Sequence, residues 1–111
     1  MNTKTLLLLI SVVVCGCSKS SEGNLPPQLW SDHKQLMTSV NVCAEKATVI
    51  LSSLGFSSVV RNGNFSYGNL RGNRAAVKCV ENPGGSFVYF AVAGSDKESV
   101  ERLRNEIAWK F

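Results

Sequence analysis

Residues 75–93 read AAVKCVENPGGSFVYFAVA, and this stretch decides the fold class of the chain. Apolar residues recur at every second position on both sides of NPGG at 82–85, which is a typical turn sequence. The pattern predicts two antiparallel strands, over 75–81 and 87–93, joined by a tight turn.

The alternation also assigns the two faces of these strands. The side chains predicted to face the helices are those of Ala75, Val77, Cys79, Val88, Phe90 and Val92. The opposite face is predicted to carry Lys78, Val80, Phe87, Tyr89 and Ala91.

Helical periodicity lies on both sides of the strand region. Apolar residues spaced by three and four over 30–54 predict a first helix that stops before Gly55. Ser95 and Glu98 form a capping-box pattern at the start of a last helix, whose apolar stripe ends at Phe111.

Between the helices, residues 56–61 predict a short strand, and NGNFSYGNLRGNR at 62–74 is dominated by turn-forming Gly and Asn. A further short strand over 65–67 stays open. The predicted fold class is α+β in the order α-β-β-β-α: a three-stranded antiparallel sheet with two helices on one face and one disulfide.

The chain has 111 residues, which suits one domain, and its 44% hydrophobic and 18% charged residues are ordinary for a globular protein. The formal net charge of +4 is mild, and the basic residues are scattered along the chain. The composition therefore gives no reason to expect a nucleic-acid partner.

Residues 1–17, MNTKTLLLLISVVVCGC, have the features of an export signal. Lys4 precedes an apolar run over 6–14, which is shorter than the roughly 20 residues that a membrane-spanning helix needs. The end of the segment resembles the bacterial lipoprotein signal, because Val14, Gly16 and Cys17 match its aliphatic, small and cysteine positions. Cys15 is a poorer lipid site because Val14 before it is not small.

The resemblance implies a signal peptide over 1–16, thioether-linked lipid on Cys17 and often a third, amide-linked acyl chain such as palmitate. Two or three acyl chains anchor a protein stably to a membrane. Ser18 favours the outer membrane facing the periplasm over the inner membrane. The predicted divisions are then a lipidated tether over 17–29, rich in Ser and Pro, and a single domain over 30–111. The alternatives are an ordinary cleaved leader with a soluble periplasmic product and an uncleaved anchor.

The four cysteines agree with export. Cys15 leaves with the leader and Cys17 takes lipid, so Cys43 and Cys79 remain as a pair in a compartment that favours disulfides. We predict that they are bonded. A metal or redox role is disfavoured because neither has a CxxC partner and His33 lies far away in the sequence.

The region over 43–107 also resembles small bacterial envelope proteins of uncharacterised function. The residues that carry this resemblance are Cys43, Gly55-Phe56, Tyr67-Gly68, Cys79, Val92-Ala93-Gly94 and Asp96. The resemblance brings no activity with it.

No catalytic set is evident in the sequence. The only histidine, His33, has no nucleophile signature around it and is expected near the start of the first helix. Asp96, Glu98 and Glu101 cluster where they favour a helix dipole. We therefore expect a non-enzymatic protein without cofactor or metal. A cell-wall or lipid hydrolase that uses Glu81 or Asp96 is the enzymatic alternative.

A binding surface is the functional hypothesis that the sequence favours. Its candidate residues are Phe65, Tyr67, Arg71, Arg74, Lys78, Phe87 and Tyr89, on one sheet face and the neighbouring loop. The equally weighted alternative is that the loop folds over this face and buries the aromatic rings. The expected partners are the membrane, through Cys17, and another envelope protein. An inhibitor or immunity protein and a purely structural surface protein are the other hypotheses.

Overall fold

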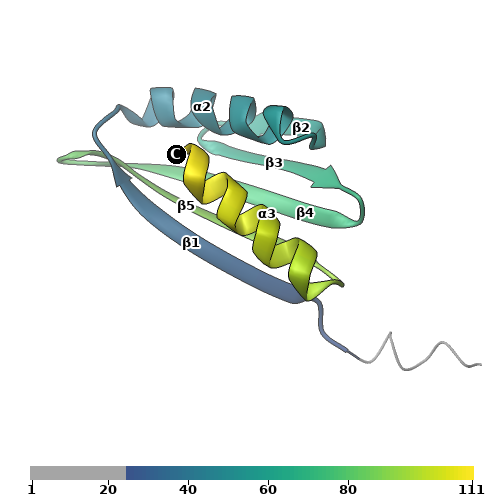
Figure 1. The fold of residues 1–111 in the computed structure, drawn as a ribbon. Coiled ribbons are helices and arrows are strands. Elements are labelled where there is room, and N and C mark those ends of the chain that lie inside the picture. The colour runs from purple at the N-terminus through teal and green to yellow at the C-terminus, as the bar shows by residue number, and fades with distance from the viewer. Residues whose placement is uncertain (1–24) are drawn as a thin grey trace, which may run out of the picture.

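The computed structural model of the protein describes residues 25–111. The predicted signal peptide, Cys17 and most of the predicted tether lie outside these residues. In chain order the elements are β1 (Gln28–Leu36), α2 (Val40–Ser53), β2 (Ser57–Asn62), β3 (Phe65–Leu70), β4 (Asn73–Asn82), β5 (Gly85–Gly94) and α3 (Lys97–Lys110) (Figure 1). Neither helix of this described part has the length and apolar character needed to cross a membrane.

The five strands form one sheet in the order β1-β5-β4-β3-β2, with every neighbouring pair antiparallel. β2 to β5 are a continuous meander. β1 pairs with β5 along its whole length, from Gln28 opposite Gly94 to Leu36 opposite Ser86. α2 therefore carries the chain across the sheet, from the edge that β1 forms to the edge that β2 forms.

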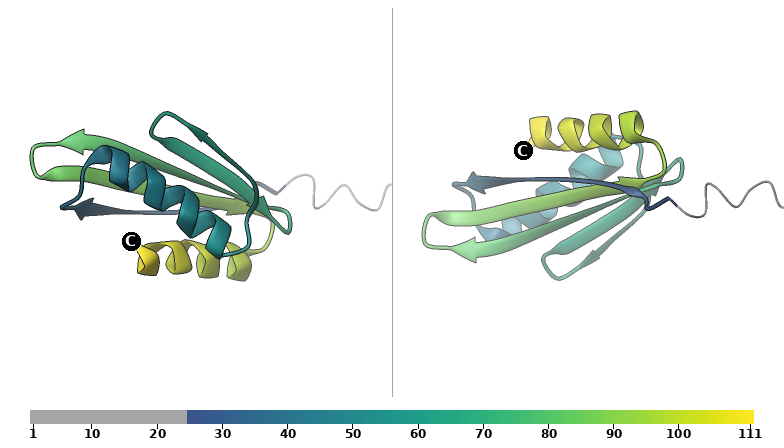
Figure 2. Two further views of the ribbon diagram at one scale, coloured as in Figure 1. Left: turned by 90° about the horizontal axis from the view of Figure 1, so that it is seen from above. Right: turned by 90° about the horizontal axis from the view of Figure 1, so that it is seen from below.

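Both helices lie on the same face of the sheet, so the domain has two layers (Figure 2). α2 packs on β2 to β5, and α3 packs on β1 and β5. The core between the layers contains Cys43, Ala44, Ala47, Ile50 and Leu51 of α2, Ala75, Val77 and Cys79 of β4, Val88, Phe90 and Val92 of β5, and Val100, Leu103 and Ile107 of α3. The face assignment predicted for β4 and β5 is confirmed by these buried residues.

The predicted three-stranded sheet is wrong, because the sheet has five strands. Two segments account for the difference. Residues 30–36, expected in the first helix, belong to β1, and the helix begins only at Val40. Residues 65–70, within the expected turn region, form β3.

β1 escapes prediction because it is an edge strand whose inner face is largely polar. Trp30, Asp32, Lys34 and Leu36 share the helix-covered face, but only Leu36 is buried. Side chains at an edge stay exposed, and Lys34 reaches past the core so that its Nζ donates to the carbonyl of Ala108, 3.2 Å away. The apolar alternation that marks a strand is therefore weak here.

β3 was not predicted because the segment over 62–74 is rich in Gly and Asn. Some of these residues form the hairpin turns before and after β3, and Gly68 lies within the strand at a close contact. Gly63 has φ 63°, and Arg71 and Gly72 have φ 50° and 80°, as expected for the central residues of tight hairpins. Gly68 lies inside the strand, where a Cβ would be 3.2 Å from both Phe56 Cβ and Val59 Cγ2. The strand needs a glycine there because the segment that follows α2 packs directly on it.

The β4–β5 hairpin also fixes the connection between β1 and α2. Ser86 Oγ donates to the carbonyl of Thr38 over 2.8 Å. Gly85 has φ 132°, and a Cβ at this position would lie 2.5 Å from the carbonyl oxygen of Leu36. The NPGG turn thus ends in a glycine because the neighbouring backbone leaves no room for a side chain.

Each helix begins at a side-chain cap. Ser39 Oγ accepts from the backbone N–H of Val42 at the start of α2. At the start of α3 the cap is Asp96, whose carboxylate accepts from the backbone N–H of Ser99 over 3.0 Å. The predicted capping box with Ser95 as its first residue is therefore displaced by one residue.

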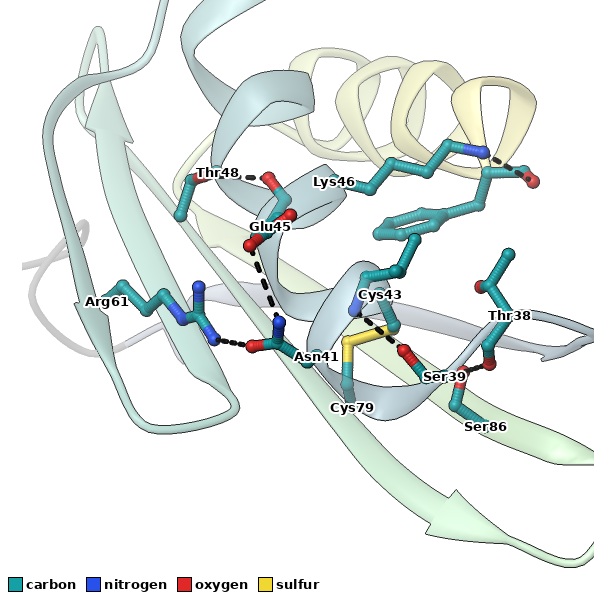
Figure 3. The surroundings of a disulfide bond; sticks show 12 residues. Thr38, Ser39, Asn41, Cys43, Glu45, Lys46, Thr48, Arg61, Cys79 and Ser86 are labelled. Carbon is teal, nitrogen blue, oxygen red and sulfur yellow. Dashed lines mark hydrogen bonds between the residues drawn. A yellow bond between two sulfur atoms is a disulfide. The ribbon is translucent and has the colours of Figure 1, made fainter.

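The predicted Cys43–Cys79 disulfide is present, with a Cα–Cα distance of 6.1 Å (Figure 3). Cys43 lies in the first turn of α2 and Cys79 near the middle of β4, and both are buried. The bond joins the helix layer to a central strand across a sequence separation of 36 residues.

We expect loss of this bond to lower the free energy of unfolding by about 3–4 kcal/mol, because the closed loop restricts the unfolded chain. Urea unfolding of Cys43→Ala/Cys79→Ala against the unchanged protein measures this loss. A reductant should destabilise the unchanged protein and leave the double variant as it is. A loss below about 1 kcal/mol would contradict the entropic role of the bond.

Candidate functional site

The sheet face opposite the helices is the candidate functional site. Both helices pack on the other face, and no element within 25–111 covers this one, as the view from below shows (Figure 2, right). We call it the open face. It carries the side chains of alternate residues in all five strands, because neighbouring residues of a strand point to opposite faces.

Six of the seven predicted binding residues lie on the open face. They are Phe65 and Tyr67 on β3, Arg74 and Lys78 on β4, and Phe87 and Tyr89 on β5. The register of these three strands brings them together from segments that are up to 24 residues apart. Phe65 and Tyr67, expected in a loop beside the sheet, lie instead on β3, on the same face as Lys78, Phe87 and Tyr89.

A row of rings and one cation crosses the middle of this face. Lys78 is paired with Tyr89 on one side and with Phe65 on the other. His33 of β1 continues the row beyond Tyr89, and its ring stacks on Phe87 with centroids 5.4 Å apart. The cation thus stands between aromatic side chains of two neighbouring strands.

A second group on the open face surrounds Arg74. Its guanidinium lies over the ring of Tyr67, 5.6 Å from the centroid, and its Nε donates to Asn69 Oδ1 over 2.9 Å. Phe65 packs beside Tyr67 with centroids 5.6 Å apart. These contacts hold the arginine in one position along the face, as a cation–π pair and a hydrogen bond do together.

Apolar surface is exposed along the open face. Tyr89 is 47% exposed, Val60 and Val80 are each 42% exposed, and Leu29 is 69% exposed. Phe65, Tyr67 and Phe87 are half-buried by their neighbours in the sheet. Exposed apolar side chains on several strands of one sheet face are a feature of interaction sites.

Arg71 does not belong to this surface. It lies in the β3–β4 turn with a positive φ, beyond the last residue of β3, and it is exposed there. The alternative in which the loop folds back over the aromatic rings is also wrong, because residues 65–70 are paired into the sheet.

His33 is the residue of this surface that sequence reasoning missed. It was expected near the start of a helix, but it lies in β1, directly opposite Tyr89. The signal that identifies it is the position of Ser39, since a serine cap at the start of α2 leaves the residues before it free to form a strand.

The residues proposed for the hydrolase alternative are not brought together. Glu81 lies next to the β4–β5 turn and Asp96 follows the other end of the ten-residue β5. A strand of this length separates its ends by about 30 Å. Asp96 is occupied as a helix cap. Within 25–111 there is also no group of three side chains placed to bind a metal ion.

A second exposed surface lies along the outer side of α3. A shallow groove there is lined by Leu54, Arg102, Glu106 and Trp109, among others. Trp109 is 87% exposed. This groove lies on the helix layer and is separate from the open face.

Comparison with protein-family models, with curated proteins and with solved structures finds no match for this chain.

The carboxylate of Asp96 makes the free energy of unfolding of the domain depend on pH. Hydrogen bonds from the hydroxyl and the backbone N–H of Ser99 lower the pKa of Asp96 below its ordinary value. The folded state therefore gains stability from this group above the unfolded pKa of about 3.9, and loses it as the pH falls through the lower folded pKa.

We expect Asp96→Asn, which keeps an acceptor at the cap, to be less stable than the unchanged protein at neutral pH. The difference should shrink as the pH falls from about 3.9 through the lower folded pKa, because the carboxylate is protonated first in the unfolded state and then in the folded state. Urea unfolding of both proteins across this range measures it. A difference that stays constant with pH would contradict this role of the charge.

Proposed function

We propose that the protein is a non-enzymatic, lipid-anchored binding module of the bacterial cell envelope, and that its open face holds the partner. The observation that carries this proposal is the assembly of six predicted binding residues on one sheet face that no described element covers. Tyr, Phe and Arg side chains are enriched in the cores of protein interfaces.

The lipid anchor is proposed because the end of the leader, at Val14, Gly16 and Cys17, resembles a lipoprotein signal. Residues 17–27 would link the lipid on Cys17 to β1 and span at most about 36 Å when extended. Leu25 and Pro26, which precede β1, lie near Gly72 and Ser95. This is the end of the sheet that contains the β3–β4 turn. An anchored domain would thus have this end nearest the membrane, and we propose the outer membrane facing the periplasm.

The anchor predicts a defined mass for the protein extracted from bacterial membranes. The mature chain should begin at Cys17 and carry two or three acyl chains. Intact-mass spectrometry measures this, and Cys17→Ala is the control that should remain unlipidated. A lipid-free chain of the unchanged protein would contradict the anchor, and an intact leader would contradict export.

The open face predicts position-dependent crosslinking in living cells. A photo-crosslinking amino acid in place of Tyr89 should give discrete adducts on irradiation, because this side chain is 47% exposed on the open face. The matched control is Val49, which is 66% exposed on α2 in the helix layer. Western blots of irradiated cells show the adducts.

Adducts at both positions, or at Val49 alone, would contradict the assignment of the open face as the binding surface. The absence of adducts at Tyr89, in cells where the protein is folded and present at its normal level, would contradict a binding function for this face.

A further inference from the structure

The acidic residues of the domain all lie on one side of the sheet. Most of the basic residues lie on that side as well, namely Lys34, Lys46, Arg61 and those of α3. Residues 25–111 contain seven acidic residues, and none of them projects from the open face. Asp32 and Glu81 point toward the helix-covered side, since each lies two residues after a residue of that face, Trp30 and Cys79. The others are on the helices or cap one of them: Glu45, Asp96, Glu98, Glu101 and Glu106.

The open face carries the opposite charge. Arg74 and Lys78 project from it on the same strand, about 13 Å apart along β4. Neither has a carboxylate neighbour on this face. Arg74 is held by Tyr67 and Asn69, a ring and a neutral amide, so its charge is not compensated. The surface is therefore positive as well as aromatic.

The small number of cationic side chains on the open face favours a protein partner over a polyanion such as nucleic acid. Only Arg74 and Lys78 carry a permanent charge on the open face. Proteins bind nucleic acids largely through many Lys and Arg contacts to phosphates, and two cations supply few such contacts. Two cations among exposed rings and valines match a protein partner better, because interface cores combine aromatic side chains with a few paired charges.

Resting on the proposed binding function, we propose that the open face binds an acidic protein surface. Aspartate or glutamate side chains of the partner pair with Arg74 and Lys78. Apolar side chains of the partner cover Tyr89 and the half-buried rings beside it. The uncompensated charge steers the encounter and rejects basic partners, and the aromatic surface supplies the buried area.

The test uses the full chain in detergent and a phage-displayed library of random peptides. Peptides are selected against the unchanged protein, against Arg74→Glu/Lys78→Glu, and against Arg71→Glu. Arg71→Glu is the matched control, because it reverses a charge that lies in the β3–β4 turn and off the open face. Circular dichroism establishes that each variant is folded, and Arg74→Gln/Lys78→Gln replaces the double reversal if that variant does not fold.

We expect the unchanged protein and Arg71→Glu to select peptides enriched in Asp and Glu. The double reversal should lose this enrichment and bind a selected acidic peptide at least about tenfold more weakly. Binding of that peptide to the unchanged protein should also weaken as salt is raised.

Several outcomes would overturn the proposal. Peptides without acidic enrichment would show that the face binds by another chemistry, and the proposed binding function would survive. An equal effect of Arg71→Glu would place the charge dependence outside the open face. If the protein binds dextran sulfate or single-stranded DNA and selects no peptide, the ligand of the open face is a polyanion and not an acidic protein. No selected peptide, together with no crosslink at Tyr89, would remove the binding function itself.

Discussion

The disulfide between Cys43 and Cys79 holds the two layers of the domain in one arrangement. It joins the first turn of α2 to a central strand, and α2 has to cross the sheet to bring the chain from β1 to β2 at the far edge. A domain of this size has a small core, so a covalent link between its layers contributes a large share of its stability. The bond thereby fixes the start of α2 over β4.

Within residues 25–111, the same arrangement leaves one side of the sheet without a covering layer. Both helices pack on the disulfide side, and α3 lies over β1 and β5. Antiparallel sheets with one covered face usually alternate apolar and polar residues. β4 and β5 depart from this rule because Val80, Phe87 and Tyr89 point to the uncovered side. Apolar residues where a solvated strand would carry polar ones are consistent with the proposed binding surface.

The two sides of the sheet also differ in the charged residues that they carry. The acidic side chains of the described part belong to the helix layer or to the helix-covered side of the strands, where Asp96 and Glu98 also favour the start of α3. Arg74 and Lys78 project from the uncovered side. The net charge of the whole chain does not reveal that the open face lacks acidic residues, because it sums the charges of both sides of the sheet. The proposed acidic partner follows from the distribution of charge and not from its sum.

Local sequence patterns were sufficient to predict the β4–β5 hairpin with its two faces, the last helix, and the pairing of Cys43 with Cys79. They also identified six of the side chains on the open face. That residues 28–36 form a strand became evident only from the fold, because an edge strand with polar residues on both faces is defined by its pairing with β5, whose partner residues are 50 or more positions away in the sequence. The same pairing between distant strands places His33 on the open face and leaves Arg71 in a turn outside it. No local pattern of residues encodes this register.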